Sequence, residues 1–154
     1  MASRTQSTPP LQSGRHPKFR SIHPSPVFPL ARSPRVLLID DDAMVRRALV
    51  RGLQRKYAVT DLADAESALA LIAGGARFDA ILCDLNLGGM SGRDFFLCLD
   101  AKDEDQARRV VILTGNFTAG LFGDRAPRFL EKPASMAMID AALADLVSPD
   151  MRAA

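Results

Sequence analysis

The sequence predicts an α/β fold in which helices cover both faces of a doubly wound, five-stranded parallel sheet. Short apolar runs rich in β-branched residues recur along the chain, as expected for strands buried on both faces. Segments with apolar residues at helical spacing separate these runs, and glycine or proline marks several of the junctions. Strands that alternate with helices in this way form right-handed crossovers, which place parallel strands side by side.

The first half of the predicted domain holds two strand–helix pairs. The apolar run Val36–Ile39 predicts a strand at about 35–40, and Val59 and Leu62 predict a second at about 58–62. The helix expected at about 43–56 has a predicted inward face of five apolar residues: Met44, Val45, Ala48, Leu49 and Leu53. The helix expected at about 65–73 presents Ala65, Leu69 and Ile72, and the glycines that follow end it.

The second half continues the same alternation. Apolar runs predict strands at about 79–84, 110–114 and 128–131. A helix at about 92–101 carries Phe95, Phe96 and Leu99, and a last helix at about 135–147 ends at Ser148-Pro149. Residues 115–126 contain three glycines and predict no single element.

Composition separates a tail from this domain. Residues 1–35 hold six Lys/Arg and no acid, whereas residues 36–154 hold fourteen Lys/Arg and eighteen Asp/Glu. Seven of the ten prolines lie at or before Pro34. We therefore expect a disordered basic Pro/Ser/Arg-rich tail at 1–33, a folded domain at 35–148 and a short carboxyl-terminal tail at 149–154. With no secretory signal and no apolar stretch long enough for a membrane span, we expect a cytoplasmic protein.

Polar side chains follow four of the predicted strands. The acids Asp40, Asp41 and Asp42 follow the first strand, Asp84 ends the third, Thr114 ends the fourth and Lys132 follows the fifth. The carboxyl ends of parallel strands meet at one edge of a sheet, so these side chains converge. Taken singly, each has a simpler explanation as a helix cap, a turn residue or a solvated lysine.

Together these residues point to phosphoryl chemistry. A carboxylate such as Asp84 can accept a phosphoryl group as an aspartyl phosphate. The acidic run offers the hard oxygen ligands that Mg²⁺ prefers, and crowded carboxylates repel one another without a cation. Lys132 supplies positive charge for the phosphoryl oxygens, and Thr114 supplies a hydroxyl donor.

Residues 35–147 resemble the receiver domain of two-component response regulators. The matching motifs are Val36–Asp42 followed by Arg46-Arg47, Asp84-Leu85-Asn86 with Met90-Ser91-Gly92, Leu113-Thr114-Gly115 and Phe129–Pro133. The resemblance implies a flavodoxin-like (βα)5 fold with strand order 2-1-3-4-5.

The resemblance also implies a role for each residue of the site. Asp84 corresponds to the phosphoacceptor, and Asp41, Asp84 and the backbone carbonyl of Asn86 to the direct Mg²⁺ ligands. Asp40 corresponds to the acid that contacts the cation through water. An Asp41–Asp42 pair is the alternative, and Asp40–Asp41 is preferred because the first acids after the strand match the family.

Three further residues correspond to the switch of the family. Thr114 and Lys132 match its phosphoryl-sensing pair. Phe129 matches its rotating aromatic residue and, without a hydroxyl, can signal only by packing. Lys132-Pro133 matches its cis peptide bond.

The chain also departs from the family in two places. Gly88 stands where proline is usual. The interval from Thr114 to Lys132 is short by about one helical turn, so the helix expected there is stunted or irregular.

The resemblance implies a stand-alone receiver, a phosphoacceptor and not an enzyme. It would take its phosphoryl group from a sensor histidine kinase or a histidine phosphotransfer protein and signal to a downstream protein that the sequence does not name. No DNA-binding or other output domain is expected after the last helix.

Three alternatives stand beside this expectation. The first is a receiver-like module that never takes phosphate. The second is a phosphohydrolase of the haloacid-dehalogenase type, which Asn86 disfavours because that class carries an acid two residues after its nucleophile. The third is weak, salt-sensitive binding of the basic tail to nucleic acid or an acidic membrane.

Overall fold

The computed structural model describes residues 32–116, 120–123 and 125–148 of the chain. Contacts divide the chain into two units, Met1–Ala31 and Arg32–Ala154, and the described residues all belong to the second. The tails expected at 1–33 and 149–154 therefore lie outside the described residues, apart from positions 32 and 33.

Five parallel strands form one sheet in the order β2-β1-β3-β4-β5, which confirms the predicted topology. Their bounds are β1 Arg35–Ile39, β2 Ala58–Leu62, β3 Ala80–Asp84, β4 Val110–Thr114 and β5 Arg128–Glu131. The helices are α1 Ala43–Leu53, α2 Ala65–Ala73, α3 Gly92–Lys102, α4 Glu104–Ala107 and α5 Met136–Val147. These bounds agree with the predicted ones to within three residues at every end of the predicted elements.

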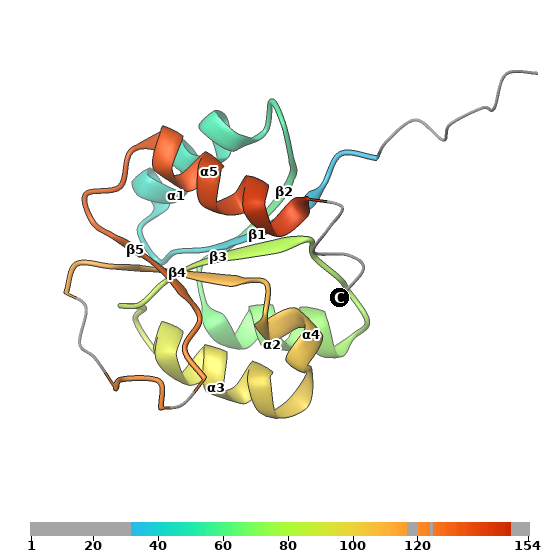
Figure 1. The fold of residues 1–154 in the computed structure, drawn as a ribbon, viewed down its shortest axis with the longest axis vertical. Coiled ribbons are helices and arrows are strands. Elements are labelled where there is room, and N and C mark those ends of the chain that lie inside the picture. Colours follow the sequence, from blue (N-terminus) through green and yellow to red (C-terminus); the bar gives the residue numbers. More distant parts are fainter. Residues whose placement is uncertain (1–31, 117–119, 124, 149–154) are drawn as a thin grey trace, which may run out of the picture. The chain divides into compact units, whose positions relative to one another are not determined.

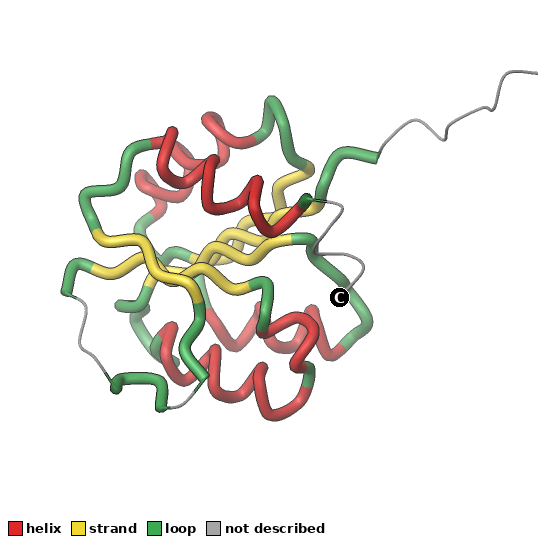
Figure 2. Tube along the Cα trace, viewed as in Figure 1, coloured by secondary structure: helices red, strands yellow, loops and turns green. Residues whose placement is uncertain are grey.

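The helices form two layers with the sheet between them (Figures 1 and 2). Alternate strand residues point to opposite faces. Leu37 and Ile39 of β1 belong to the core cluster under α2 and α3, whereas Val36 and Leu38 belong to the cluster under α1 and α5. The three central strands are therefore almost entirely buried, as their continuous apolar sequences predicted.

Polar residues fix where the helices start. The side chains of Asp42, Asp64, Ser91 and Ser135 each accept a hydrogen bond from a backbone N–H in the first turn of the helix that follows. Because each cap follows the end of a strand by only a few residues, the caps bring the helix starts close to the carboxyl edge of the sheet.

The structure corrects the sequence-based reading of α1. Leu49 and Leu53 are buried as expected, but Met44 is 79% exposed, Val45 is 40% exposed and Ala48 is exposed too. Helical spacing alone does not show which of several apolar stripes faces the core. Only the stripe that contains Leu49 and Leu53 faces the core in this helix.

The crossover between β4 and β5 differs from the other crossovers of the sheet. None of the described residues between these strands is helical, in keeping with the short interval. Gly120 and Gly123 have φ values of +84° and +68°, a conformation that a right-handed helix does not allow. The four-residue helix α4 lies instead between α3 and β4, where the sequence predicted no element.

Each helix in the described part of the chain is too short or too polar to span a lipid bilayer.

Candidate functional site

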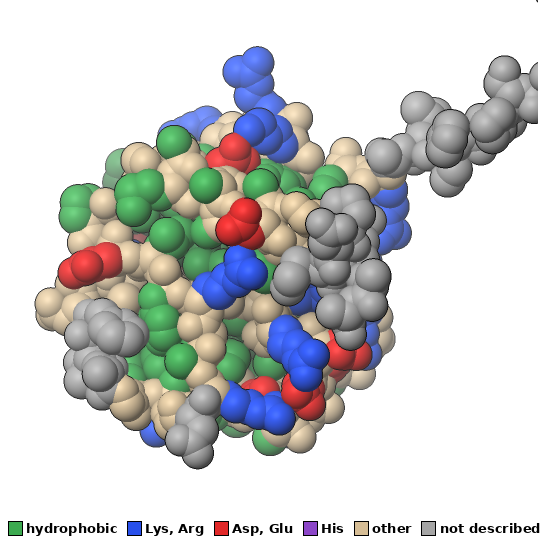
Figure 3. All heavy atoms as spheres, viewed as in Figure 1, with side chains coloured by type: hydrophobic (Ala, Val, Ile, Leu, Met, Phe, Trp, Pro, Cys, Tyr) green, Lys and Arg blue, Asp and Glu red, His purple; other side chains and the backbone are tan. Residues whose placement is uncertain are grey.

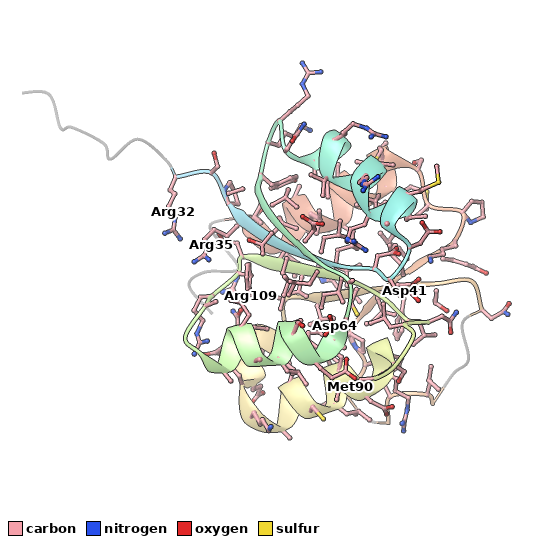
Figure 4. The ribbon with its side chains drawn as sticks, turned by 180° about the vertical axis from the view of Figure 1, so that it is seen from behind. Arg32, Arg35, Asp41, Asp64, Met90 and Arg109 are labelled. Carbon is pink, nitrogen blue, oxygen red and sulfur yellow. The ribbon has the colours of Figure 1, made fainter. Side chains whose placement is uncertain are left out.

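The carboxyl edge of the sheet brings together the side chains that the sequence placed at the strand ends. Asp40 directly follows β1, Asp84 ends β3, Thr114 ends β4 and Lys132 directly follows β5. Seen from behind, Asp41 lies toward this edge, whereas Arg32, Arg35 and Arg109 lie toward the opposite edge (Figure 4). Parallel pairing of β1, β3, β4 and β5 in sequence is what aligns these ends.

Asp84 lies at the bottom of the site and is 7% exposed. Its Oδ2 forms an ion pair of 3.0 Å with Nζ of Lys132, and its Oδ1 accepts a hydrogen bond of 3.3 Å from the N–H of Asn86. The Lys132 side chain is 38% exposed. A buried carboxylate is therefore held beside an ammonium group that remains in contact with solvent.

Three carboxylates crowd this position. Asp40, Asp41 and Asp84 can each offer an oxygen so that all three oxygens lie within 4.8 Å of one another. Asp40 is 1% exposed, and its Oδ2 is buried without a hydrogen-bond partner. Burial first, and then the neighbouring charges of Asp84 and Asp41, raise the pKa of the Asp40 carboxyl above its usual value, although a backbone hydrogen bond and Lys132 oppose the rise.

This donor set fits a divalent cation such as Mg²⁺. Hard cations take oxygen ligands, and a buried carboxylate oxygen with no hydrogen donor is a position that a cation would satisfy. The residues that could hold the cation are Asp40, Asp41 and Asp84. Asn86 lies next to them, because its N–H already contacts Asp84.

Asp42 has a different environment. Its Oδ1 accepts hydrogen bonds of 2.8 Å and 3.1 Å from the N–H groups of Met44 and Val45. These backbone bonds lower the pKa of its carboxyl. Asp42 thus caps α1, and the cluster of three carboxylates contains Asp40 and Asp41 instead.

Thr114 is buried, and its hydroxyl is engaged within its own loop. Its Oγ1 donates a hydrogen bond of 2.8 Å to the carbonyl of Asn116 and accepts one of 3.2 Å from the Asn116 N–H. The backbone N–H of Lys132 donates to the carbonyl of Thr114 at 2.7 Å, which joins the two residues. The hydroxyl must leave Asn116 before it can donate to a group on Asp84.

Phe129 is half-buried on β5, below Lys132. Its ring packs edge-to-face against Phe122 at a centroid distance of 5.1 Å, and Phe122 packs in the same manner against Phe96 of α3 at 5.6 Å. Phe122 belongs to the segment that replaces a helix between β4 and β5. An aromatic row thus connects β5 to α3 through this segment.

Cys83 precedes Asp84 and is fully buried. Its thiol donates a hydrogen bond of 3.2 Å to the Asp84 carbonyl, and burial raises the pKa of the thiol far above its ordinary value. The second free cysteine, Cys98, is only partly buried.

Two residues in contact with the site are absent from the sequence-based set. Glu66 of α2 accepts a hydrogen bond from the Met90 N–H, and Arg46 of α1 donates one of 2.7 Å to the Asp40 carbonyl while it pairs with Asp61. Both lie on helices, where a charged residue normally indicates a solvated face. Nothing in the spacing of Glu66 distinguishes it from other helical charges, whereas Arg46 follows the acidic run in a motif of the family resemblance.

Comparison with known proteins links this geometry to one family. The sequence profile described as the response regulator receiver domain matches residues 36–144. The transcriptional activator protein PfeR of Pseudomonas aeruginosa is 32% identical over 119 residues, which are 71% of this chain and 36% of PfeR. The chain thus spans about a third of the length of that relative.

Solved structures agree with this match. The chemotaxis response regulator CheY4 of Vibrio cholerae has a TM-score of 0.63 and 28% identity, over 73% of this chain and 98% of CheY4. A structure described as adenylate cyclase from Rhodopirellula baltica has a TM-score of 0.67 and 28% identity, over 75% and 87% of the two chains.

Proposed function

The chain belongs to the response regulator receiver domain family, whose members are phosphoacceptor modules and not catalytic enzymes, and we propose that it accepts a phosphoryl group on Asp84. The observation that carries the proposal is the position of Asp84, a buried carboxylate paired with Lys132 and crowded by Asp40 and Asp41. These residues form the arrangement that transfer of a dianionic group to a carboxylate requires.

In the proposed reaction, one Asp84 oxygen attacks the phosphorus atom of a phosphohistidine. The new O–P bond forms as the N–P bond breaks, and the imidazole leaves with the electron pair and takes up a proton from water. When bound, Mg²⁺ offsets negative charge on the transferring oxygens, and Asp40, Asp41, Asp84 and the Asn86 carbonyl are the ligands that we propose for it.

Lys132 and Thr114 have proposed roles after transfer. The Lys132 ammonium exchanges its ion pair with the Asp84 carboxylate for one with the phosphoryl oxygens. The Thr114 hydroxyl leaves the Asn116 carbonyl and donates to the same group. The side chain of Phe129 then repacks against Phe122, so the change reaches the surface through contacts already in place.

The partner that supplies the phosphoryl group is, by family, a histidine kinase or a histidine phosphotransfer protein. We propose that it docks beside the acidic cluster, on the apolar first turn of α1. Met44, which is 79% exposed, and Val45, which is 40% exposed, follow Asp41 by only a few residues. Such a surface suits an amphipathic helix that presents its histidine to Asp84.

The test is intact-mass analysis after incubation with acetyl phosphate and Mg²⁺. The natural chain should gain one phosphoryl mass that needs Mg²⁺ and is lost in alkali, and Asp84→Asn should gain none. Asp105→Asn, at an exposed acid on α4, is the matched control and should behave as the natural chain does.

A chain that binds Mg²⁺ but never gains the phosphoryl mass would contradict the proposal. It would instead favour a receiver-like module that acts without phosphorylation. A phosphoryl mass gained by Asp84→Asn to the same extent as by the natural chain would mean that another residue is the acceptor.

A further inference from the structure

We propose that Glu66 is a positioning residue for the metal site, although it lies on α2 and does not belong to the acidic cluster. This inference rests on the proposed function, since it concerns the same cation. The carboxylate of Glu66 fixes the loop between β3 and α3, here called the 86–90 loop. The fixed loop in turn holds Asn86 and Asp41 in position before the cation arrives.

Two carboxylates bind the 86–90 loop through its backbone. Oε1 of Glu66 accepts a hydrogen bond of 3.0 Å from the Met90 N–H. Oδ2 of Asp41 accepts one of 3.1 Å from the Gly88 N–H. The loop therefore connects Glu66 to a proposed metal ligand through a span of three residues. Asp41, Met90 and the α2 cap Asp64 lie on the same side of the domain (Figure 4).

Two glycines allow this close approach. Gly89 has a φ of +148°, which disfavours any other residue, and a Cβ placed there would lie 3.3 Å from Oε1 of Glu66. A Cβ at Gly88 would lie 3.3 Å from Oδ2 of Asp41. Side chains at these positions would press against both carboxylates. The departure from the family at Gly88 also matters, because proline has no N–H to donate to Asp41.

The two ends of the loop are fixed by other contacts. Asn86 donates its N–H to Asp84, and the N–H of Gly92 donates to the Leu85 carbonyl at 2.9 Å. A Cβ at Gly92 would lie 2.3 Å from the Asp84 carbonyl oxygen, so α3 begins directly against the end of β3. Between these fixed ends, Leu87 and Met90 pack against the hydrophobic core, and Glu66 adds a hydrogen bond from outside the acidic cluster.

A fixed loop favours cation binding because less freedom is lost when the ligands assemble. Asp41 can keep its bond to Gly88 through one oxygen and offer the other to the cation. Partners of metal ligands typically change metal affinity by about ten- to a hundredfold when they are removed. Since Glu66 acts through the three residues Gly88, Gly89 and Met90, we expect an effect at the lower end of that range.

The experiment is isothermal titration of MgCl₂ into the unphosphorylated full chain. Glu66→Ala, which removes the acceptor, should weaken Mg²⁺ binding by about tenfold. Glu66→Gln keeps an acceptor oxygen and should stay close to the natural chain. The matched control is Glu104→Ala, which removes another acid from the first turn of a helix, away from the cluster.

Equal weakening in Glu66→Gln and Glu66→Ala would overturn the proposal, because the effect would then come from charge and not from the hydrogen bond. Unchanged affinity in Glu66→Ala would overturn it directly.

Amide hydrogen exchange at Met90 in the metal-free chain separates failure of this inference from failure of the proposed function. Exchange should be several-fold faster in Glu66→Ala than in the natural chain, whether or not the chain takes phosphate. An unchanged rate would show that Glu66 does not hold the loop. A natural chain that binds no Mg²⁺ and gains no phosphoryl mass would refute the proposed function, and with it the role of Glu66 at a metal site.

Discussion

The buried carboxylate of Asp40 lowers the stability of the fold, and its place in the candidate site explains why it is there. Its carboxylate is 1% exposed, one of its oxygens lacks a hydrogen-bond partner, and two further carboxylates lie beside it. A buried, unsatisfied charged group destabilises a folded domain. An apolar or amide side chain would suit the metal-free fold better, which supports the proposed role of Asp40 at a cation site.

Replacing Asp40 by Asn should therefore stabilise the metal-free domain. We expect a gain of about 1–2 kcal/mol in unfolding free energy at neutral pH, because Asn keeps the acceptor for the Asp42 N–H and removes the buried charge. Urea denaturation in EDTA measures the gain. A natural chain more stable than the variant under these conditions would contradict the explanation.

The pH dependence of this gain follows from the direction of the pKa shift. Burial raises the pKa of Asp40 in the folded domain above 3.8, so protonation favours folding. The natural carboxyl therefore stabilises the fold most below that value and loses this advantage as the pH rises through the folded pKa. The gain from Asp40→Asn should shrink as denaturation is repeated toward about pH 4.

At the scale of single residues, the sequence predicts position better than orientation. Asp84, Thr114 and Lys132 could be placed because parallel strands end at one edge. The engagement of the Thr114 hydroxyl with Asn116 depends on a side-chain torsion that no pattern records. Glu66 was missed for a related reason, since its partner is a backbone N–H in a loop 24 residues away.

At the scale of elements, the start of α3 is a tight junction between a helix and a strand. Gly92 packs against the last residue of β3, where a Cβ would lie 2.3 Å from the Asp84 carbonyl oxygen and 2.9 Å from Cα of Leu85. Both are backbone atoms, so neither can move without moving the strand that carries Asp84. The start of α3 thus packs directly against the end of β3, which carries the proposed phosphoacceptor.

Gly92→Ala should destabilise the domain by about 2–3 kcal/mol, because the added methyl group forces the backbone of α3 away from β3. Urea denaturation measures this loss. Gly115→Ala is the matched control, since a Cβ at Gly115 meets nothing within 4 Å. Equal stability of the two variants would show that α3 can move away from β3 at little cost in free energy, which would contradict the prediction.

A second junction joins α1 to α5 on the other face. The hydroxyl of Tyr57, just after α1, donates a hydrogen bond of 2.9 Å to Asp140 of α5, and Lys56 pairs with the same carboxylate. Burial first, and then Asp140, raise the pKa of Tyr57 to about 12. The neutral phenol therefore favours folding below about pH 10, and this advantage is lost as the pH rises from about 10 to 12.

Tyr57 is the only tyrosine of the chain, so alkaline absorbance titration of the phenol reports on it alone. The midpoint should lie near 12 in the folded domain and near 10 in urea. Asp140→Ala should lower the folded midpoint part of the way, since burial remains. Asp145→Ala, at a neighbouring acid of α5 that pairs with Arg128, should leave it unchanged. A folded midpoint near 10 would contradict the buried hydrogen bond.

Elements with regular patterns were predicted closely, and those without were not. Continuous apolar runs predicted the central strands. Helix α4 has four residues, fewer than any periodic pattern needs, and its sequence was indistinguishable from a charged linker. The exposure of Met44 shows a different limit, since spacing identifies an apolar stripe and only the packed fold decides whether it is covered.

At the scale of the whole molecule, exposed charges form ion pairs more completely than the carboxylates of the site do. Arg125 pairs with Asp100 and Glu104, and Arg108 also pairs with Glu104. Figure 3 shows such alternation of basic and acidic side chains over the lower right of the face in view. Exposed pairs of this kind contribute little to stability. By contrast, the three carboxylates of the site are not balanced by positive side chains beside them. Cation binding should therefore stabilise the entire domain.

Removing Mg²⁺ should lower the stability of the whole domain. A cation present at a hundred times its dissociation constant stabilises the folded state by about 2.7 kcal/mol, so thermal unfolding should shift upward between EDTA and MgCl₂. Asp41→Asn should abolish most of the shift. Asp42→Asn should retain it, because Asn caps a helix as well as Asp does. If Asp42→Asn lost the shift and Asp41→Asn kept it, Asp42 and not Asp41 would be the cation ligand.

The burial of Cys83 makes its thiol a probe for opening of β3, the strand that ends in the proposed phosphoacceptor Asp84. Its thiol lies one residue from Asp84 and is inaccessible while β3 stays in the sheet. Alkylating reagents can therefore reach Cys83 only during openings that also expose the Asp84 backbone to water, whereas Cys98 reacts from the closed state. At a reagent concentration high enough to label Cys83 in every opening, its labelling rate equals the rate of those openings. If β3 opens more slowly than the phosphoryl group is lost, hydrolysis takes place in the folded site. The lifetime of the phosphorylated state is then set by chemistry there and not by opening of the sheet.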